Sequence, residues 1–237
     1  MADQRVQERP PVRVLAVQRH RCVAVFAAVL IAVTSSAGQT PATDTSPAAE
    51  AARALNLGQF DRVETLLRSA TDERSIVIRA RSAIARGRYT DAERLLTGIV
   101  SSSPAGDAAL ELGQLYLYLG RREEGGRLLQ TVLTRGARNS PASLLRLGLA
   151  ARALGRFQDA NAFLRSAGMM APDDPVINAA WGELFLEKYN RADAVRSFQE
   201  ALKADPDYLP ARIGLAKATI EQDPAAAKGA AEGVLEL

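Results

Sequence analysis

Two side-chain groups that enzymes often use as catalytic base and nucleophile, imidazole and thiol, are confined to one short stretch of this sequence. The only histidine, His20, and the only cysteine, Cys22, both lie within residues 1–37. A chain without that stretch has no imidazole for a His-based triad, no thiol nucleophile and none of the common zinc ligands. We therefore expect no metal site, no cofactor and no enzyme activity.

Carboxylates could still act as a general acid and base. The candidates all stand in short segments beside prolines: Asp173, Asp174, Asp205 and Asp207. There a carboxylate more often caps the next helix, and we expect this of each of the four. The glycine-containing segment 120–126 is not expected to be a phosphate loop, because it has no Lys-Ser/Thr and no strand before it.

The elements that carry these residues are predicted to be helices. Aromatic residues make up only 5% of the chain, which is poor for strands, and Ala, Leu, Arg and Glu are abundant. We therefore expect an all-α protein.

A repeating pattern begins near residue 48. A short loop, usually starting with Gly, precedes a helix with a small or β-branched residue at a fixed place: Val63, Ala92, Gly125, Ala160 and Ala194. The intervals between these residues are 29, 33, 35 and 34, which is typical of repeat proteins.

A second helical pattern precedes the later loops and carries a glycine in its middle. Gly113, Gly148 and Gly182 each follow a large residue, Leu112, Leu147 or Trp181. Because a glycine inside a helix costs about 1 kcal/mol relative to alanine, three of them need a packing reason. We expect a neighbouring helix to approach closely there, with Trp181 and Tyr116 in the core.

Helix ends are also legible. Gly58, Gly87, Gly120 and Gly155 are predicted to end a helix in a left-handed turn, with Asn190 in that role in the fifth unit. Pro104, Pro172 and Pro206 separate one pair from the next. Met169 and Met170 close a helix and are predicted to lie in the core between repeats.

These residues resemble the tetratricopeptide repeat. The best matching units are Gly148, Gly155, Phe157, Ala160, Leu164, Ala167 and Pro172, then Gly182, Phe185, Ala194, Phe198, Ala201 and Pro206. The resemblance covers roughly residues 48–237 and implies a right-handed superhelix of about six helix pairs, whose first helices line a concave face.

The resemblance places one stripe of each first helix in that groove. We predict a peptide-binding surface formed by Leu110, Gln114, Leu117, Tyr118, Leu145, Leu149, Arg152, Glu183, Leu186 and Lys217. It would hold an apolar peptide segment, set in register by Arg152, Glu183 and Lys217. The alternative is that the apolar members are buried between adjacent first helices. Members of the family that bind C-terminal carboxylates carry Lys at places where this chain has Leu110, Leu145, Ala179 and Ile213. The resemblance therefore argues against a C-terminal tail as the ligand.

The N-terminus has the pattern of a signal peptide. An Arg-rich segment precedes a run of 12 apolar residues, Cys22–Val33, and small residues end at Ala37. We expect residues 1–37 to be a cleaved signal peptide or an uncleaved anchor, and residues 38–47 to be a flexible linker. The protein would then reach the bacterial periplasm, the cell envelope or the medium.

Charge bears on the partners. Five of the 30 basic and two of the 27 acidic residues lie in residues 1–37, so the remaining chain holds 25 of each. A neutral body lacks the basic footprint of a nucleic-acid binder. We expect protein or peptide partners, and membrane contact only through an uncleaved N-terminal segment.

The end of the sequence is apolar, with Val234, Leu235 and Leu237. Solenoids usually end in a polar helix, so this end is expected to dock on a partner or a second copy. The leading interpretation is an exported, non-catalytic scaffold that binds proteins or peptides through its groove. The alternative is a structural subunit of a membrane-associated or self-associating envelope complex.

Overall fold

The computed structural model describes residues 44–221 and 223–235. The expected leader and most of the expected linker lie outside the described residues. Within them the chain forms 12 helices and no strand: α1 (Pro47–Asn56), α2 (Phe60–Leu67), α3 (Glu73–Ala85), α4 (Tyr89–Val100), α5 (Asp107–Tyr118), α6 (Arg122–Arg135), α7 (Pro141–Ala153), α8 (Phe157–Met170), α9 (Pro175–Leu186), α10 (Arg191–Ala204), α11 (Leu209–Thr219) and α12 (Pro224–Leu235). The predicted all-α fold of about six pairs is confirmed.

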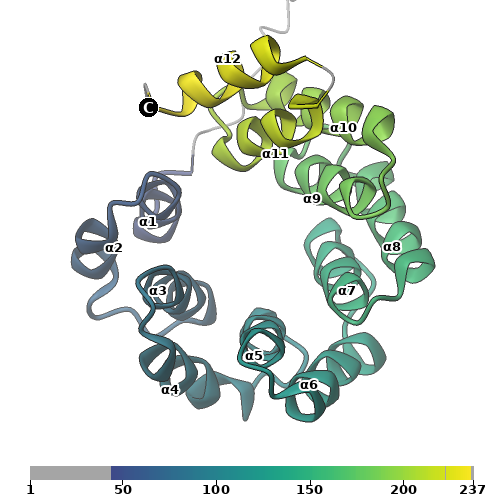
Figure 1. Ribbon diagram of the computed structural model, residues 1–237. Helices are drawn as coiled ribbons and strands as arrows, with labels where there is room; N and C mark the ends of the chain where they lie inside the picture. Colours follow the sequence, from purple (N-terminus) through teal and green to yellow (C-terminus); the bar gives the residue numbers. More distant parts are fainter. Residues whose placement is uncertain (1–43, 222, 236–237) are drawn as a thin grey trace, which may run out of the picture. The chain divides into compact units, whose positions relative to one another are not determined.

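The helices form six antiparallel hairpins arranged as an arc of two layers. The odd-numbered helices α3, α5, α7 and α9 line the inside of the arc, and their even-numbered partners form the outside (Figure 1). Each first helix contacts its own partner and the first helix of the next hairpin. This is an α–α solenoid, in which every hairpin buries its apolar faces against its neighbours.

The mid-helix glycines mark the closest approach within each hairpin. A Cβ on Gly113, Gly148 or Gly182 would lie 2.7 to 2.9 Å from the side chain of Leu129, Leu164 or Phe198 on the paired second helix. The expected packing reason for these glycines is therefore confirmed. We call the second-helix position that fills this space the knob position; it is occupied by Leu67, Leu96, Leu129, Leu164 and Phe198, each at most 1% exposed.

The turn inside each of the first five hairpins has the same geometry. Gly58, Gly87, Gly120 and Gly155 have φ between 69° and 80°, as predicted. In the fifth hairpin the prediction of Asn190 is wrong, because Tyr189 holds the left-handed conformation at φ 57° and Asn190 caps α10. Asn190 N–H still donates to Phe185 O, five residues back, so the same hydrogen bond forms without glycine.

Helix caps come from fewer aspartates than expected. Asp174 Oδ1 accepts hydrogen bonds from the N–H groups of Val176 (2.8 Å) and Ile177 (3.3 Å) and caps α9 as predicted. Asp207 instead lies 2.7 Å from Arg212, and α11 has no side-chain cap. Asp173 makes no capping bond among those of α9, and Asp205 accepts from Asp207 N–H in the turn before α11, so the expectations for Asp173, Asp205 and Asp207 are wrong. Ser46, Asp72 and Ser140 supply caps that the sequence pattern did not single out.

The methionine prediction is also wrong. Met169 is 79% exposed and Met170 is 51% exposed at the end of α8. Ala167, two residues earlier, is the fully buried member of that last turn, so the helix turns its methionines away from the core.

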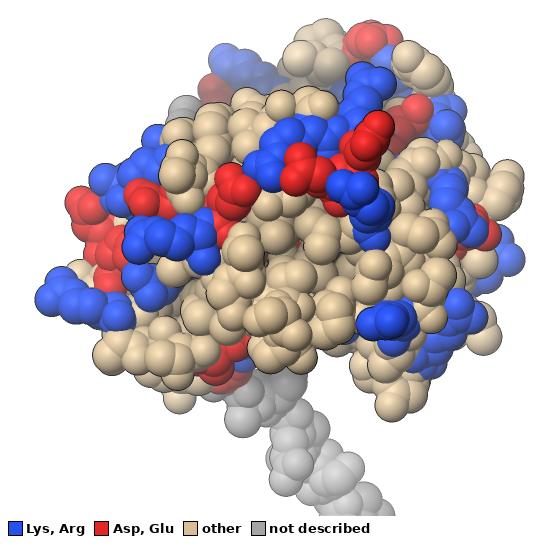
Figure 2. All heavy atoms as spheres, turned by 90° about the horizontal axis from the view of Figure 1, so that it is seen from below, with Lys and Arg blue, Asp and Glu red and all other residues tan. Residues whose placement is uncertain are grey.

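Charged side chains of both signs lie scattered among uncharged residues on the face seen in Figure 2. Figure 2 shows Lys and Arg interspersed with Asp and Glu over one face of the molecule. Several pairs join residues three apart on one second helix, such as Arg94 with Asp91 (3.1 Å) and Arg156 with Asp159 (2.6 Å). Exposed pairs of this kind contribute only about 0.3–0.5 kcal/mol each, so the buried seams account for most of the stability.

Two adjacent glycines in α6 provide a matched test of the seams. A Cβ on Gly125 would lie 2.7 Å from Gly113 O and 3.0 Å from Leu117 N, both backbone atoms, whereas one on Gly126 would meet nothing within 4 Å. We expect Gly125→Ala to lower the free energy of unfolding by about 1–3 kcal/mol. Gly126→Ala should raise it by up to about 1 kcal/mol through helix propensity. Urea denaturation checks both, and equal effects would contradict the seam.

The unusual turn residue can be tested separately. Tyr189 is 87% exposed, so little packing is lost on its removal, and its left-handed backbone costs about 1 kcal/mol. We expect Tyr189→Gly to raise the thermal midpoint, and Tyr189→Ala, which keeps the Cβ, to leave it unchanged. Equal gains from both variants would show that the exposed ring, and not the backbone, limits stability.

Candidate functional site

A row of charged side chains runs along the inside of the arc, on the first helices. Each member lies on a first helix, or in the case of Glu187 directly after one, and pairs with a residue of an adjacent first helix, so the pairs belong to the inner layer shown in Figure 1. We call this set the concave row; its members are Arg81, Asp107, Glu111, Arg146, Arg152, Glu183, Glu187 and Lys217.

The first part of the row joins α3, α5 and α7. Arg81 Nε of α3 donates to Glu111 Oε1 of α5 at 2.8 Å, and Glu111 is only 8% exposed. One turn before Glu111, Asp107 accepts a hydrogen bond of 2.6 Å from Arg146 Nε of α7. Because removing the partner of a buried carboxylate is costly, the Arg81–Glu111 pair helps to hold α3 and α5 in register, whereas the Asp107 side chain is 48% exposed.

The second part of the row joins α7, α9 and α11. Arg152 Nε donates to Glu187 Oε1 at 2.8 Å, and its Nη2 lies 3.5 Å from Glu183. Lys217 Nζ of α11 lies 3.8 Å from the other oxygen of Glu183. The side chains of Arg152, Glu183 and Lys217 are 23%, 30% and 61% exposed, so they are reachable from the interior of the arc.

The inner surface also faces the start of α11. The side chain of Tyr208 is close enough to Arg81 for the two charges to interact, although seven helices separate α3 from α11 in the chain. Burial raises the pKa of Tyr208 to about 12; Asp174 and Asp205 add to the rise and Arg81 opposes it.

A pocket of about 540 Å³ lies beside Tyr208, between the end of α1 and the turn from α10 to α11. Its lining includes Arg53, Asn56 and Leu57 on one side and Asp205 and Asp207 on the other. The end of α1 in the first hairpin therefore lies near the turn that joins the fifth hairpin to the sixth, and the hairpins surround most of the inner surface.

The predicted groove residues divide by burial. Leu110 is 2% exposed and belongs to the core around α5 to α9, so the expectation that it faces a ligand is wrong. The other apolar members are half-buried and pack against the core: Leu117, Leu145, Leu149 and Leu186. The alternative that these residues pack between helices accounts for their burial.

The polar members of the predicted set keep access to solvent. Gln114 is half-buried on α5, and Arg152, Glu183 and Lys217 belong to the concave row. Sequence reasoning missed Arg81, which occupies in α3 the position that Gln114 occupies in α5, and the Asp107–Arg146 pair. The repeat interval of 33 between Gly87 and Gly120 would have pointed to Arg81.

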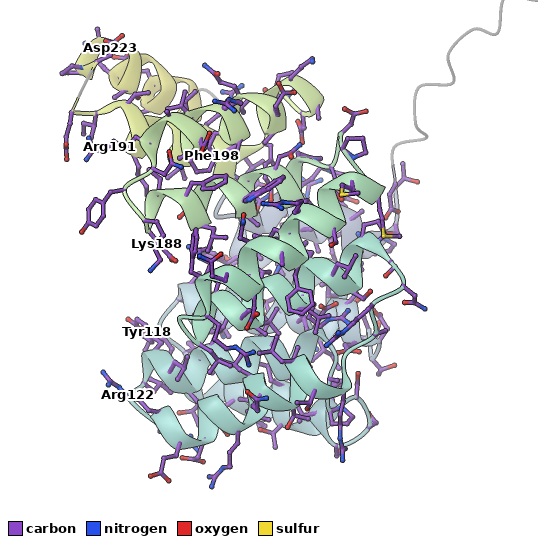
Figure 3. All side chains as sticks on the ribbon, turned by 90° about the vertical axis from the view of Figure 1, so that its right-hand side faces the viewer. Tyr118, Arg122, Lys188, Arg191, Phe198 and Asp223 are labelled. Carbon is purple, nitrogen blue, oxygen red and sulfur yellow. The ribbon has the colours of Figure 1, made fainter. Side chains whose placement is uncertain are left out.

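Tyr118 lies at the edge of the arc. It is 72% exposed, and its ring centroid lies 5.6 Å from that of Tyr89 of the preceding hairpin. Figure 3 shows Tyr118, Arg122, Lys188 and Arg191 along this edge, which the turns inside the hairpins form. Tyr118 is therefore a surface residue, as expected, but it belongs to the edge of the groove.

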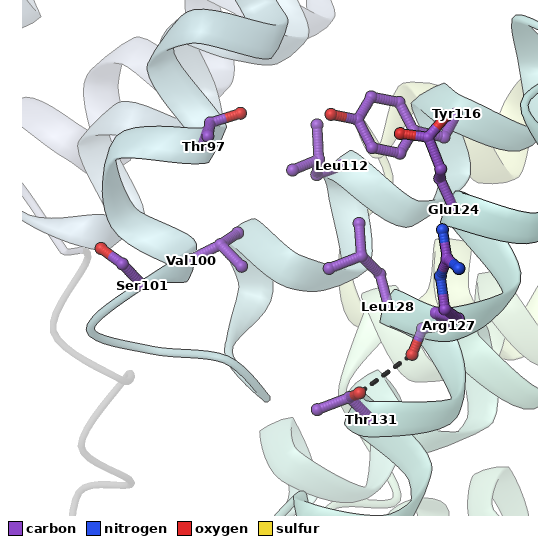
Figure 4. Close-up of a pocket in the computed structure, with 9 residues that line it drawn as sticks. All are labelled: Thr97, Val100, Ser101, Leu112, Tyr116, Glu124, Arg127, Leu128 and Thr131. Carbon is purple, nitrogen blue, oxygen red and sulfur yellow. Dashed lines mark hydrogen bonds between the residues drawn. The ribbon is translucent and has the colours of Figure 1, made fainter.

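A pocket of about 460 Å³ lies on the outside, between α4 and α6. Figure 4 shows its floor, formed by Leu112 and Tyr116, and its lining residues: Thr97, Val100, Ser101, Leu112, Tyr116, Glu124, Arg127, Leu128 and Thr131. An equivalent hollow of about 280 Å³ lies over Trp181 and Phe185. Tyr116 is 8% exposed, and Trp181 Nε1 donates to Asn161 at 2.9 Å, so both aromatics pack largely as predicted.

In residues 44–221 and 223–235, no three His, Cys, Asp or Glu side chains come together in a way that could hold a metal ion. Of the helices in this part of the chain, none has both the length and the apolar character to cross a membrane.

Comparison with known proteins identifies the repeat that these hairpins form. Residues 79–121 and 110–175 match the family model described as tetratricopeptide repeat. A comparison with curated protein sequences gave no match. Among solved structures, a thermophilic TPR protein of Thermus thermophilus is 25% identical; the alignment covers 73% of this chain and 97% of that chain with a TM-score of 0.55. The described chain has the tetratricopeptide-repeat fold.

Two more distant structures share this fold. The APC/C hetero-tetramer Cut9-Hcn1 is 18% identical over 81% of this chain and 39% of that chain, with a TM-score of 0.53. The human IFIT1 dimer with PPP-AAAA is 16% identical over 81% of this chain and 50% of that chain, with a TM-score of 0.58. Tetratricopeptide repeats generally serve as scaffolds for protein interaction.

The pKa of Tyr208 gives a test of how enclosed the inner surface of these repeats is. A folded-state pKa of about 12, above the unfolded value of about 10, means that the folded protein favours the neutral phenol. This contribution is complete below pH 10 and is lost as the pH rises from about 10 to about 12. We expect Tyr208→Phe to lose less stability over that range than the natural protein. Chemical denaturation at pH 9, 10 and 11 measures the difference; parallel curves would show that Tyr208 is open to water.

Proposed function

We propose that the protein is an exported, non-catalytic scaffold that binds an extended segment of another protein along its concave face. The observation that carries this proposal is the concave row, a series of charges on successive first helices whose side chains range from nearly buried, at Glu111, to 61% exposed, at Lys217. Fold alone specifies no ligand, so the proposal depends on these side chains.

The row favours a segment that carries charges of both signs. Arg152 and Lys217 both pair with Glu183. A ligand carboxylate can therefore bind one of these two cations in place of Glu183, which keeps its pair with the other. A ligand lysine or arginine can do the same at Glu187, whose side chain is 49% exposed. Of the leucines first predicted for this surface, Leu110 is buried and the other four are half-buried, which argues for a charged segment in place of an apolar one.

Charged binding of this kind is selective because each exchange must match in position. An apolar segment would cover the paired charges without replacing their water, which costs free energy. A segment with alternating signs satisfies each member of the row as it is covered.

We expect Arg152→Ala combined with Lys217→Ala to weaken binding of such a segment at least tenfold, because two cations that face the groove are lost. The probe is a set of 15-residue fluorescein-labelled peptides in three classes: mixed charge, amphipathic apolar, and neutral polar. Fluorescence anisotropy at 50 and 300 mM salt measures binding, which should weaken with salt for the mixed-charge class alone.

The control is Arg94→Ala, which removes an arginine that is 78% exposed on the outer helix α4. It should bind the mixed-charge peptides as the natural protein does. Equal losses in both variants, or tight binding of the apolar class alone, would refute a charged concave site.

Export is proposed from the N-terminal sequence. The Arg-rich segment, the apolar run Cys22–Val33 and the small residues up to Ala37 support it. We expect the full chain, produced in a bacterium, to be recovered outside the cytoplasm beginning at Gly38, without Cys22 and His20. Intact mass and N-terminal sequencing test this. Recovery from the membrane with the leader intact would indicate an anchor, and an uncut cytoplasmic protein would overturn export.

A further inference from the structure

The open face of the last hairpin holds an apolar hollow of about 460 Å³. Ile213 and Ala216 of α11, with Ile220 directly after that helix, form one wall, and Ala227 and Ala231 of α12 form the other. Ile213 is 39% exposed and Ile220 is 59% exposed. Two exposed isoleucines gathered in one hollow make this face a candidate for contact with another molecule.

The hollow exists because α12 lacks a large residue at the knob position. In the other five second helices a small residue is followed four positions later by a fully buried knob, such as Ala194 by Phe198. In α12 the buried Ala227 is followed by Ala231, which is exposed. The space that a leucine or phenylalanine fills in every preceding hairpin is therefore open here.

The preceding hairpins show what covers such a face. The corresponding face of α9 and α10 is covered by α11, whose Ala211 and Ala218 are fully buried in the same cluster as Phe198. A Cβ on Gly214 of α11 would lie 2.3 Å from the Phe198 ring, so the incoming helix presents small residues to a large knob. On α11 and α12 no helix of the described part of the chain takes this place.

At the last face the knob position is small, so an incoming helix has to present large residues where α11 presents small ones. Because Ala231 leaves the knob space empty, a helix that fills this face has to bring the large apolar side chain itself. Helices that bind in grooves generally insert such anchors at i and i+3 or i+4.

The charge beside the hollow narrows the choice further. Lys217 and Lys228 line it, with side chains 61% and 74% exposed, and each makes only a long ion pair, with Glu183 at 3.8 Å and with Glu232 at 3.5 Å. A second copy with the same face would bring four lysines together, and the chain's own apolar run at 22–33 follows a segment with five arginines. Both meet like charge, whereas a helix with acidic residues beside its apolar stripe meets opposite charge.

We propose that the α11–α12 face is a docking site for an amphipathic helix of a partner protein, which inserts a leucine or phenylalanine into the hollow and places acidic residues against Lys217 and Lys228. This site shares Lys217 with the concave row, but its hollow and Lys228 lie outside that row, and it does not depend on the function proposed for the row.

The test uses three blocked, labelled 16-residue helical peptides. The acidic probe has Leu, Phe and Leu at i, i+4 and i+7 with flanking glutamates. The basic probe has lysines in their place, and the third replaces the phenylalanine of the acidic probe by alanine. Fluorescence anisotropy should show that the acidic probe binds at least tenfold more tightly than either of the others.

Ala231→Leu separates this site from any other on the protein. The variant restores the missing knob, so it should raise the thermal midpoint and weaken the acidic probe at least tenfold. It should still bind mixed-charge peptides at the concave row. Lys228→Glu should reverse the preference between the acidic and basic probes, and Met169→Glu, an exposed apolar residue on α8, should change neither.

Two results would overturn the proposal. The first is an acidic probe that binds Ala231→Leu as tightly as the natural protein, which would place the contact elsewhere. The second is light scattering that shows a dimer of the natural protein and a monomer of Ala231→Leu, which would assign the face to a second copy.

Discussion

The contact between a first helix and the knob of its partner is the constraint on which the described structure depends. At Gly113, Gly148 and Gly182 the first helix has no Cβ, and a leucine or phenylalanine from the second helix occupies the space. This contact sets the distance between the two helices of a hairpin. Because a knob also supports the next first helix, as Phe198 does for α11, the same contact passes the spacing along the chain. Where Ala231 replaces the knob, the constraint is relaxed and an apolar hollow opens.

The inner surface follows from this spacing. The first helices lie close together on the inside of the arc. A side chain on one of them can therefore reach a side chain on the next whose position in the repeat differs by about one helical turn. Pairs such as Arg81–Glu111 and Arg152–Glu187 then run from helix to helix. The apolar seams carry most of the stability, since exposed ion pairs such as Arg152–Glu187 contribute little, and the buried Glu111 is the member of the row that is coupled most closely to the fold.

Much of the fold could be predicted from residues alone, because a repeat states each local choice several times. The glycine turns and the mid-helix glycines were legible for this reason. Asn190 was misassigned because the left-handed residue of that turn is Tyr189, and a side chain there is tolerated only when the surrounding hydrogen bonds hold the backbone. Met169 and Met170 were misplaced because helical period alone does not say which flank of the last turn meets the next hairpin.

The sequence by itself determined the helical hairpins, their number and the residues at which they meet, since these depend on contacts between positions a fixed distance apart. It also carried the signal-like N-terminus and the neutral charge of the body. The tertiary structure alone decided the character of the inner face, burying Leu110 and leaving Arg81, Glu183 and Lys217 accessible. The physical reason is that exposure depends on how far each hairpin is rotated against the next, and that rotation comes from packing between hairpins and not from the pattern within one.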